Sequence, residues 1–170
     1  MAFHLTEEEV WITHVNYELS TLCEMPTLAA RYDESGPGSV KNACLESALL
    51  HGRLLIEFLV GRPQRNGGRS RSSRDVAPTD FLPGWEYPEP ERFDQYLEII
   101  DPHVAHLSKQ RSNIGTPKPG YLTSLADDIL AGVHFFAQAL VAAGSPYASN
   151  FQTAVTQGKA YRSRGPNHWP

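Results

Sequence analysis

The chain has few cysteines, and their spacing excludes the usual zinc motifs. Cys23 and Cys44 are its two cysteines, and they form no C-x-x-C pair. Each lies within an apolar pattern of helical spacing, so we expect buried free thiols and neither a disulfide nor a zinc site.

Long hydrophobic runs are also missing. No stretch of about 18 consecutive apolar residues appears, and residues 1–6 lead directly into Glu7-Glu8-Glu9. This start lacks both the basic and the apolar part of a secretory signal peptide. We therefore expect a cytoplasmic protein with no membrane partner.

The common catalytic motifs are absent as well. The sequence holds no GxGxxG, P-loop, HExxH, GxSxG or zinc-knuckle pattern, which removes support for most nucleotide-binding, metalloprotease and serine-hydrolase classes. The net charge of −4 gives no overall attraction for nucleic acids. With 41% hydrophobic and 20% charged residues, residues 1–170 are expected to form a single globular domain with a core.

Apolar residues recur at helical spacing along most of the chain. Thr6-x-x-Glu9 is a capping box that begins the first helix, and Pro26 is expected to bend or end it. The predicted helices span residues 6–25, 40–60, 91–110, 122–143 and, as a short fifth helix, 147–161. This pattern predicts an all-α, up-down bundle of four to five helices with a proline-rich, aromatic loop before the third helix.

Two histidines stand one helical turn apart in Asp101-Pro102-His103-Val104-Ala105-His106. Residues at i and i+3 share a helix face, and both imidazoles titrate near neutral pH. Pro102 either kinks the third helix or begins a new one with Asp101 as its N-cap. In the second case His103 lies in a first turn, where the helix dipole favours the neutral imidazole that a base or a metal ligand must be.

The second predicted helix is apolar around most of its circumference, so its polar residues are informative. Glu46, Arg53 and Glu57 fall on one stripe, and His51 lies roughly 100–140° away. Arg53 is one turn from Glu57 and two turns from Glu46, and a half-buried charge requires such partners. A structural ion pair and a supporting role in a functional site both remain open for this stripe.

Five arginines follow this helix with no acidic residue among them. They are Arg62, Arg65, Arg69, Arg71 and Arg74, interleaved with glycine, serine, asparagine and glutamine. The composition predicts a mobile loop. Arginine supplies bidentate donors, and counterion release favours polyanions, so this loop is a candidate phosphate-binding segment. A solvated linker between helices is the equal alternative.

The helical pattern resembles the HEPN domains, many of which are ribonucleases, toxins or antiviral components. Their motif is an arginine, four residues and then a histidine, often Arg-Asn-x-x-Ala-His, which Ala105 and His106 match. Asp101 stands at the arginine position and Pro102 at the asparagine position. The resemblance implies a homodimer with a composite site, and RNA or a protein as its partner.

The chain is also similar to a group of uncharacterised bacterial helical proteins. These share His-Val-Ala-His-Leu, here residues 103–107, and a preceding helix with Leu-Glu-Ser, His-x-Arg and Ile-x-Phe, here within residues 45–58. The similarity covers most of residues 6–143. It adds support for the helical fold and carries no chemistry of its own.

Metal-independent RNA cleavage is one functional hypothesis. It requires a base for the 2′-hydroxyl proton and a cation for the phosphorane. His106 is the candidate base, with His103 beside it, and Arg53 or Arg111 is the candidate cation. Glu46, His51 and Glu57 are candidates for supporting this site, and the arginine-rich segment would guide the strand.

Two further hypotheses need no nuclease chemistry. A metal site resembling that of DinB-like four-helix bundles would hold one divalent transition metal on His51, His103 and His106. The third hypothesis is a non-catalytic, RNA-associated or defence-type domain without a cofactor, which dimerises or binds a partner. In it His103 and His106 form hydrogen bonds in a seam between helices. We favour this third hypothesis because histidines on helix flanks are more often structural than catalytic.

Overall fold

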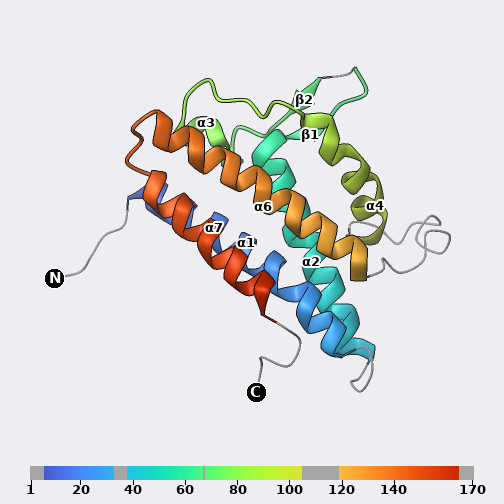
Figure 1. Cartoon of the computed structure of the whole chain (residues 1–170). Helices are drawn as coiled ribbons and strands as arrows, with labels where there is room; N and C mark the ends of the chain where they lie inside the picture. Colours follow the sequence, from blue (N-terminus) through green and yellow to red (C-terminus); the bar gives the residue numbers. More distant parts are fainter. Residues whose placement is uncertain (1–5, 33–37, 67, 105–118, 165–170) are drawn as a thin grey trace.

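Four long helices form the bundle in the computed structural model of the chain (Figure 1). They are α1 (Glu7–Arg31), α2 (Gly38–Val60), α6 (Pro119–Ala142) and α7 (Ala148–Ser163). The structure describes residues 6–32, 38–66, 68–104 and 119–164. Within the bundle α1 packs against α2, α6 and α7, and α6 packs against α2 and α7. Figure 1 shows α1 antiparallel to α2, and α6 antiparallel to α7.

Short elements connect α2 to α6. Strands β1 (Arg62–Pro63) and β2 (Arg69–Ser70) pair antiparallel, and α3 (Pro78–Phe81) follows them. A 3-10 helix, η1 (Pro90–Phe93), then leads into α4 (Asp94–Val104), which packs on α2. The predicted all-α helical bundle is thus confirmed, with a very small hairpin as its only sheet in the described residues.

An aromatic cluster at one end of the core holds the proline-rich segment in place. Phe81 on α3 lies 5.2 Å from Phe151 on α7 between ring centroids, and Phe136 on α6 lies 5.0 Å from Phe151. Trp85 packs edge-on against Phe136 at 4.8 Å. Edge-to-face contacts of this kind stabilise a core beyond the area that they bury. The expected return of this aromatic loop onto the bundle therefore occurs.

The most apolar helix is α6. The helix over residues 120–142 is long and apolar enough to cross a membrane by length and composition, and half of its most apolar 18-residue stretch is buried within the fold. The stripe that faces the core is fully buried and consists of Leu122, Leu125, Ile129, Val133, Phe136 and Leu140. Burial against α1, α2 and α7 accounts for this apolar character, as in the central helix of a bundle.

The first helix begins as predicted and continues further than predicted. The backbone N–H of Thr6 donates to Glu9 Oε2 at 2.8 Å, and the N–H of Glu9 donates to Thr6 Oγ1 at 3.2 Å, which completes the capping box. The expected end near residue 25 is wrong, because α1 continues through Pro26 to Arg31. Pro26 and Ala29 are buried, so tertiary packing offsets the backbone hydrogen bond that proline cannot make.

The third helix also passes through its proline. Helix α4 continues through Pro102 to Val104, as the predicted helix over residues 91–110 requires, and this excludes the alternative of a new helix with Asp101 as its N-cap. His103 lies in the last turn of α4 and not in a first turn. The buried positions of α4, including Ile100 and Pro102, keep one continuous face on the core across the proline. The rest of this predicted helix, residues 105–110, lies outside the described residues.

Gly132 allows a close approach between α6 and its neighbours. A Cβ atom there would lie 2.8 Å from Leu59 Cδ1 and 3.4 Å from Phe93 Cζ. We expect Gly132→Val to lower the free energy of unfolding by about 1–3 kcal/mol, because an overpacked core must shift. Urea denaturation measures this change.

Gly120 supplies the matched control on the same helix. A Cβ atom at Gly120 meets nothing within 4 Å, so Gly120→Ala is expected to leave stability unchanged or raise it by up to about 1 kcal/mol. Equal effects of the two substitutions would contradict the close packing of α6 at Gly132.

Both cysteines are buried free thiols, as predicted. Burial is the main cause that raises the pKa of the Cys23 thiol to about 12, and burial also raises the pKa of Cys44. A raised pKa keeps the thiol protonated at pH 8, and a protonated thiol is a poor nucleophile. We therefore expect Cys23 to react with a disulfide reagent such as DTNB at pH 8 only when the chain unfolds.

Single-cysteine variants separate the two thiols in this measurement. In Cys44→Ala the remaining Cys23 is expected to react at least tenfold more slowly in the native protein than in denaturant. The fold both buries the Cys23 sulfur and lowers the fraction of it that is thiolate. Similar native and denatured rates would show that Cys23 is not enclosed.

Candidate binding site between α1 and α2

The structure describes only part of the site that the histidine pair suggested. His106 and Arg111 lie outside the described residues. His103 on α4 and His51 on α2 are both 8% exposed. The convergence of these three histidines on one point therefore stays a prediction. Among the described residues, no group of three histidine, cysteine, aspartate or glutamate side chains is placed to hold a metal.

Arg53 lies between two carboxylates from different helices. Its Nε donates to Glu57 Oε1 at 2.8 Å, and its Nη1 lies 3.4 Å from Asp101 Oδ1 on α4. The side chains of Arg53 and Glu57 are only 15% and 16% exposed, so water screens this contact weakly. The ion pair predicted within α2 is confirmed, and the contact with Asp101 joins α2 to α4. Glu46, the third residue of the predicted stripe, is exposed.

His51 faces α1, on the side of α2 away from α4. Its Nδ1 forms a hydrogen bond with Glu18 Oε2 on α1, and its ring lies 5.6 Å from that of Tyr17. Residues two apart on a helix point in nearly opposite directions, so His51 meets α1 whereas Arg53 meets α4. Glu18 was not predicted from the sequence as a partner of His51. Its position next to the buried Leu19 on an amphipathic helix was the available signal.

Arg71 caps the C-terminal end of α2. Its Nη2 donates to the carbonyl oxygens of Phe58 and Leu59, both at 2.9 Å, and its Nε donates to that of Glu57 at 3.4 Å. The last carbonyls of a helix lack partners and carry the negative end of the dipole, so a guanidinium there stabilises the helix. Burial, with a smaller contribution from the nearby charge of Arg69, lowers the pKa of Arg71.

Arg69 ties the hairpin to η1 and α4. Its Nη2 donates to the Pro90 carbonyl at 2.7 Å and to Asp94 Oδ1 at 2.6 Å, and its Nη1 donates to the Gly61 carbonyl at 3.3 Å. Gly61 has a φ of 71°, and a side chain there would meet the Ser70 carbonyl oxygen at 2.9 Å. Only glycine suits this turn.

The expectation of a mobile basic loop is therefore wrong for the hairpin. Arg62 binds both carboxylate oxygens of Glu57, at 2.8 and 3.0 Å, and Arg69 and Arg71 hold backbone carbonyls. Arg65 and Arg74 are exposed and make no ion pair within the part of the chain that the structure describes. Guanidinium bonds to the α2 terminus and to α4 order the segment, which composition alone did not reveal.

Two arginines of this segment offer a matched pair of substitutions. Arg71→Ala removes three hydrogen bonds from a charged donor to helix-terminal carbonyls. We expect it to lower the free energy of unfolding by about 1–2 kcal/mol. Arg74→Ala removes an exposed side chain and should change stability by less than about 0.5 kcal/mol.

Thermal and urea denaturation of both variants give the comparison. If Arg74→Ala were as destabilising as Arg71→Ala, general charge in this segment would matter and the specific cap would not.

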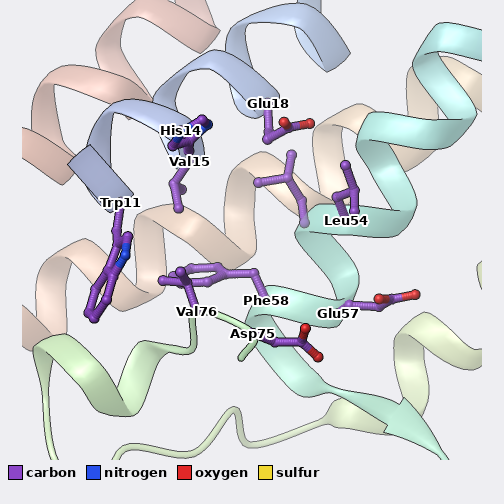
Figure 2. A pocket seen from close by; sticks show the side chains of 10 residues that line it. Trp11, His14, Val15, Glu18, Leu54, Glu57, Phe58, Asp75 and Val76 are labelled. Carbon is purple, nitrogen blue, oxygen red and sulfur yellow. The ribbon is translucent and has the colours of Figure 1, made fainter. Parts of the chain in front are cut away.

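A cavity of about 200 Å³ opens between α1, α2 and the segment after β2 (Figure 2). Its walls are apolar and include Trp11 and Val15 from α1 and Leu55 and Phe58 from α2. Polar side chains stand at its edges: His14, Glu18, Glu57 and Asp75. Figure 2 shows His14 and Glu18 on the α1 side and Asp75 on the opposite side of the Phe58 ring. The cavity thus combines an aromatic wall with a carboxylate rim.

The apolar surface extends beyond the cavity along both helices. Leu54, which lines the cavity, is 41% exposed, and Leu50, one turn earlier on α2, is 42% exposed. Tyr17 on α1 is 60% exposed and packs its edge against His51. Exposed apolar side chains that adjoin a cavity are typical of binding surfaces.

Comparisons with known proteins identify no relative of this chain. The chain matches no known protein family, no curated protein and no solved structure.

Proposed function

We propose that the chain is a non-catalytic helical binding domain, HEPN-like in architecture, that uses the α1–α2 cavity to bind its ligand. The observation that carries this proposal is the position of Arg53 between Glu57 and Asp101. Arg53 is the candidate cation of the competing nuclease hypothesis.

Cleavage of RNA through the 2′-hydroxyl builds negative charge on the phosphorane, which a nearby cation must stabilise. The charge of Arg53 is already shared by Glu57 and Asp101. Asp101 also stands where the HEPN motif has arginine, and a carboxylate there repels a phosphate instead of attracting it. Both features favour a binding role over nuclease chemistry.

The arginine-rich segment also favours a binding role over nuclease chemistry. Arg62, Arg69 and Arg71 are held in internal bonds, which leaves Arg65 and Arg74 as the arginines of this group that make no ion pair among the described residues. Nucleic-acid affinity grows with the number of phosphates that a protein neutralises. Two arginines without an ion pair, on a chain of net charge −4, supply little such affinity. The α1–α2 cavity is the better candidate for the binding surface.

Dimerisation belongs to this proposal through the HEPN resemblance. The exposed apolar side chains Tyr17, Leu50 and Leu54 are compatible with a partner on the α1–α2 face. Sedimentation equilibrium over a range of concentrations measures the oligomeric state directly.

The catalytic hypothesis is tested with labelled single-stranded and hairpin RNA, incubated with excess full-length protein in EDTA. We expect both RNAs to remain intact, and the His106→Ala protein to behave identically. Arg53→Ala serves as the second variant, since it removes the candidate cation without touching the histidines.

Cleavage that resists EDTA and is lost in both His106→Ala and Arg53→Ala would overturn the proposal. A metal content of about one zinc, nickel or iron per chain that His103→Ala abolishes would overturn it in favour of the metal hypothesis. Metal analysis of the protein, purified without chelator, provides this measurement.

A further inference from the structure

We infer that the α1–α2 cavity binds a small organic ammonium ion with an aromatic or aliphatic body. This inference rests on the proposed binding function and names its ligand class. Three properties of the cavity support it: the sign of the charge at its rim, the chemistry of its walls and its size.

The rim of the cavity is negative. No lysine or arginine is among the described residues that line it. Glu57 is neutralised by Arg53 and Arg62, which approach it from outside the lining. Neither Glu18 nor Asp75 forms an ion pair with lysine or arginine among the described residues. Glu18 pairs with His51, and Asp75 interacts electrostatically with Arg62, which is already bound to Glu57.

Each of these two carboxylates is fixed by one hydrogen bond. Glu18 bonds to His51 Nδ1, and Asp75 Oδ2 accepts the N–H of Ser72 at 2.9 Å. A backbone amide orients a carboxylate and leaves its charge in place. Carboxylates on opposite sides of an apolar cavity favour a cation over an anion.

The walls suit the body of such a ligand. Trp11 and Phe58 present aromatic rings to the space, and Val15 and Leu55 complete the apolar lining. Figure 2 shows the Phe58 ring between the α1 side chains and Asp75. An ammonium group near an aromatic face gains a cation–π attraction, and the apolar part of the ligand gains from burial.

The size of the cavity limits the ligand to one small group. Sites for drug-sized molecules typically measure about 300–1,000 Å³, and this cavity measures about 200 Å³. One ring with a short aminoalkyl chain fits this space. A nucleotide would bring phosphates to a rim of carboxylates and exceeds the volume.

The test uses NMR of the ¹⁵N-labelled full chain, in which each tryptophan indole N–H gives one signal. The three tryptophans are Trp11, Trp85 and Trp169, and Trp11→Phe assigns the signal from the cavity. The probe is 2-phenylethylammonium, and its controls of similar shape are 2-phenylethanol and 3-phenylpropionate. We expect the ammonium ion to shift the Trp11 signal with a Kd of about 1 mM, and the Trp85 signal to stay in place.

Charge dependence gives the decisive comparison. The alcohol is expected to bind about fivefold more weakly than the ammonium ion, since one partly exposed ion pair is lost, and the carboxylate should cause no shift. Equal shifts from the three probes would overturn the inference, because the cavity would then select only for an apolar body.

Variants connect the effect to the rim. Asp75→Asn and Glu18→Gln are each expected to weaken binding of the ammonium ion about fivefold. Glu98→Gln, an exposed acid on α4 outside the cavity, is the matched control and should leave the Kd unchanged. Asp75 is exposed, so its variant should fold even if Glu18→Gln does not. An equal response of Asp75→Asn and Glu98→Gln would overturn the role of the rim.

The failure of this inference can be told apart from the failure of the proposed function. RNA that stays intact together with an unmoved Trp11 signal overturns the ligand class alone. EDTA-resistant, His106-dependent cleavage overturns the proposed function, whatever the Trp11 signal does.

Discussion

The burial of α2 is the constraint on which the rest of the structure depends. This helix packs against α1, α4 and α6, and most of its circumference is apolar, so its few polar side chains must find partners at the seams. His51 meets Glu18 on α1, and Arg53 meets Asp101 on α4. Leaving a buried polar group without a partner destabilises the fold by more than a typical hydrogen bond stabilises it. These two contacts therefore set how α1 and α4 align with α2.

The same requirement explains the arginine-rich segment. The C-terminal carbonyls of a buried helix need donors, and Arg71 supplies them while Arg69 holds η1 and α4. The guanidinium groups of Arg69 and Arg71, which could otherwise bind phosphates, instead hold this segment against α4 and the C-terminal end of α2. The hairpin also carries the chain to Asp75, which places a carboxylate opposite the α1 face. The α1–α2 cavity thus takes Asp75 and Val76 from the segment that follows the cap on α2.

Sequence reasoning succeeded where the signal was local. The capping box at Thr6, the helical periodicity of α6 and the ion pair between Arg53 and Glu57 all depend on residues within a few positions of one another. It failed at Pro26, where packing on other helices keeps α1 continuous through a proline, and it left open whether the third helix breaks at Pro102, which the packing of α4 decides. Glu18 was missed for the same reason, since nothing near it in the sequence indicates His51.

The sequence by itself therefore determined the fold class, the main helices and the residues that must be paired. Periodicity and capping are properties of single segments, and they survive in any arrangement of the bundle. Only the tertiary structure decided which partners these residues take. It placed Asp101 on Arg53, Arg71 on the end of α2, and Glu18 and Asp75 around one cavity. Those contacts join segments far apart in the chain, and their geometry follows from how the helices pack.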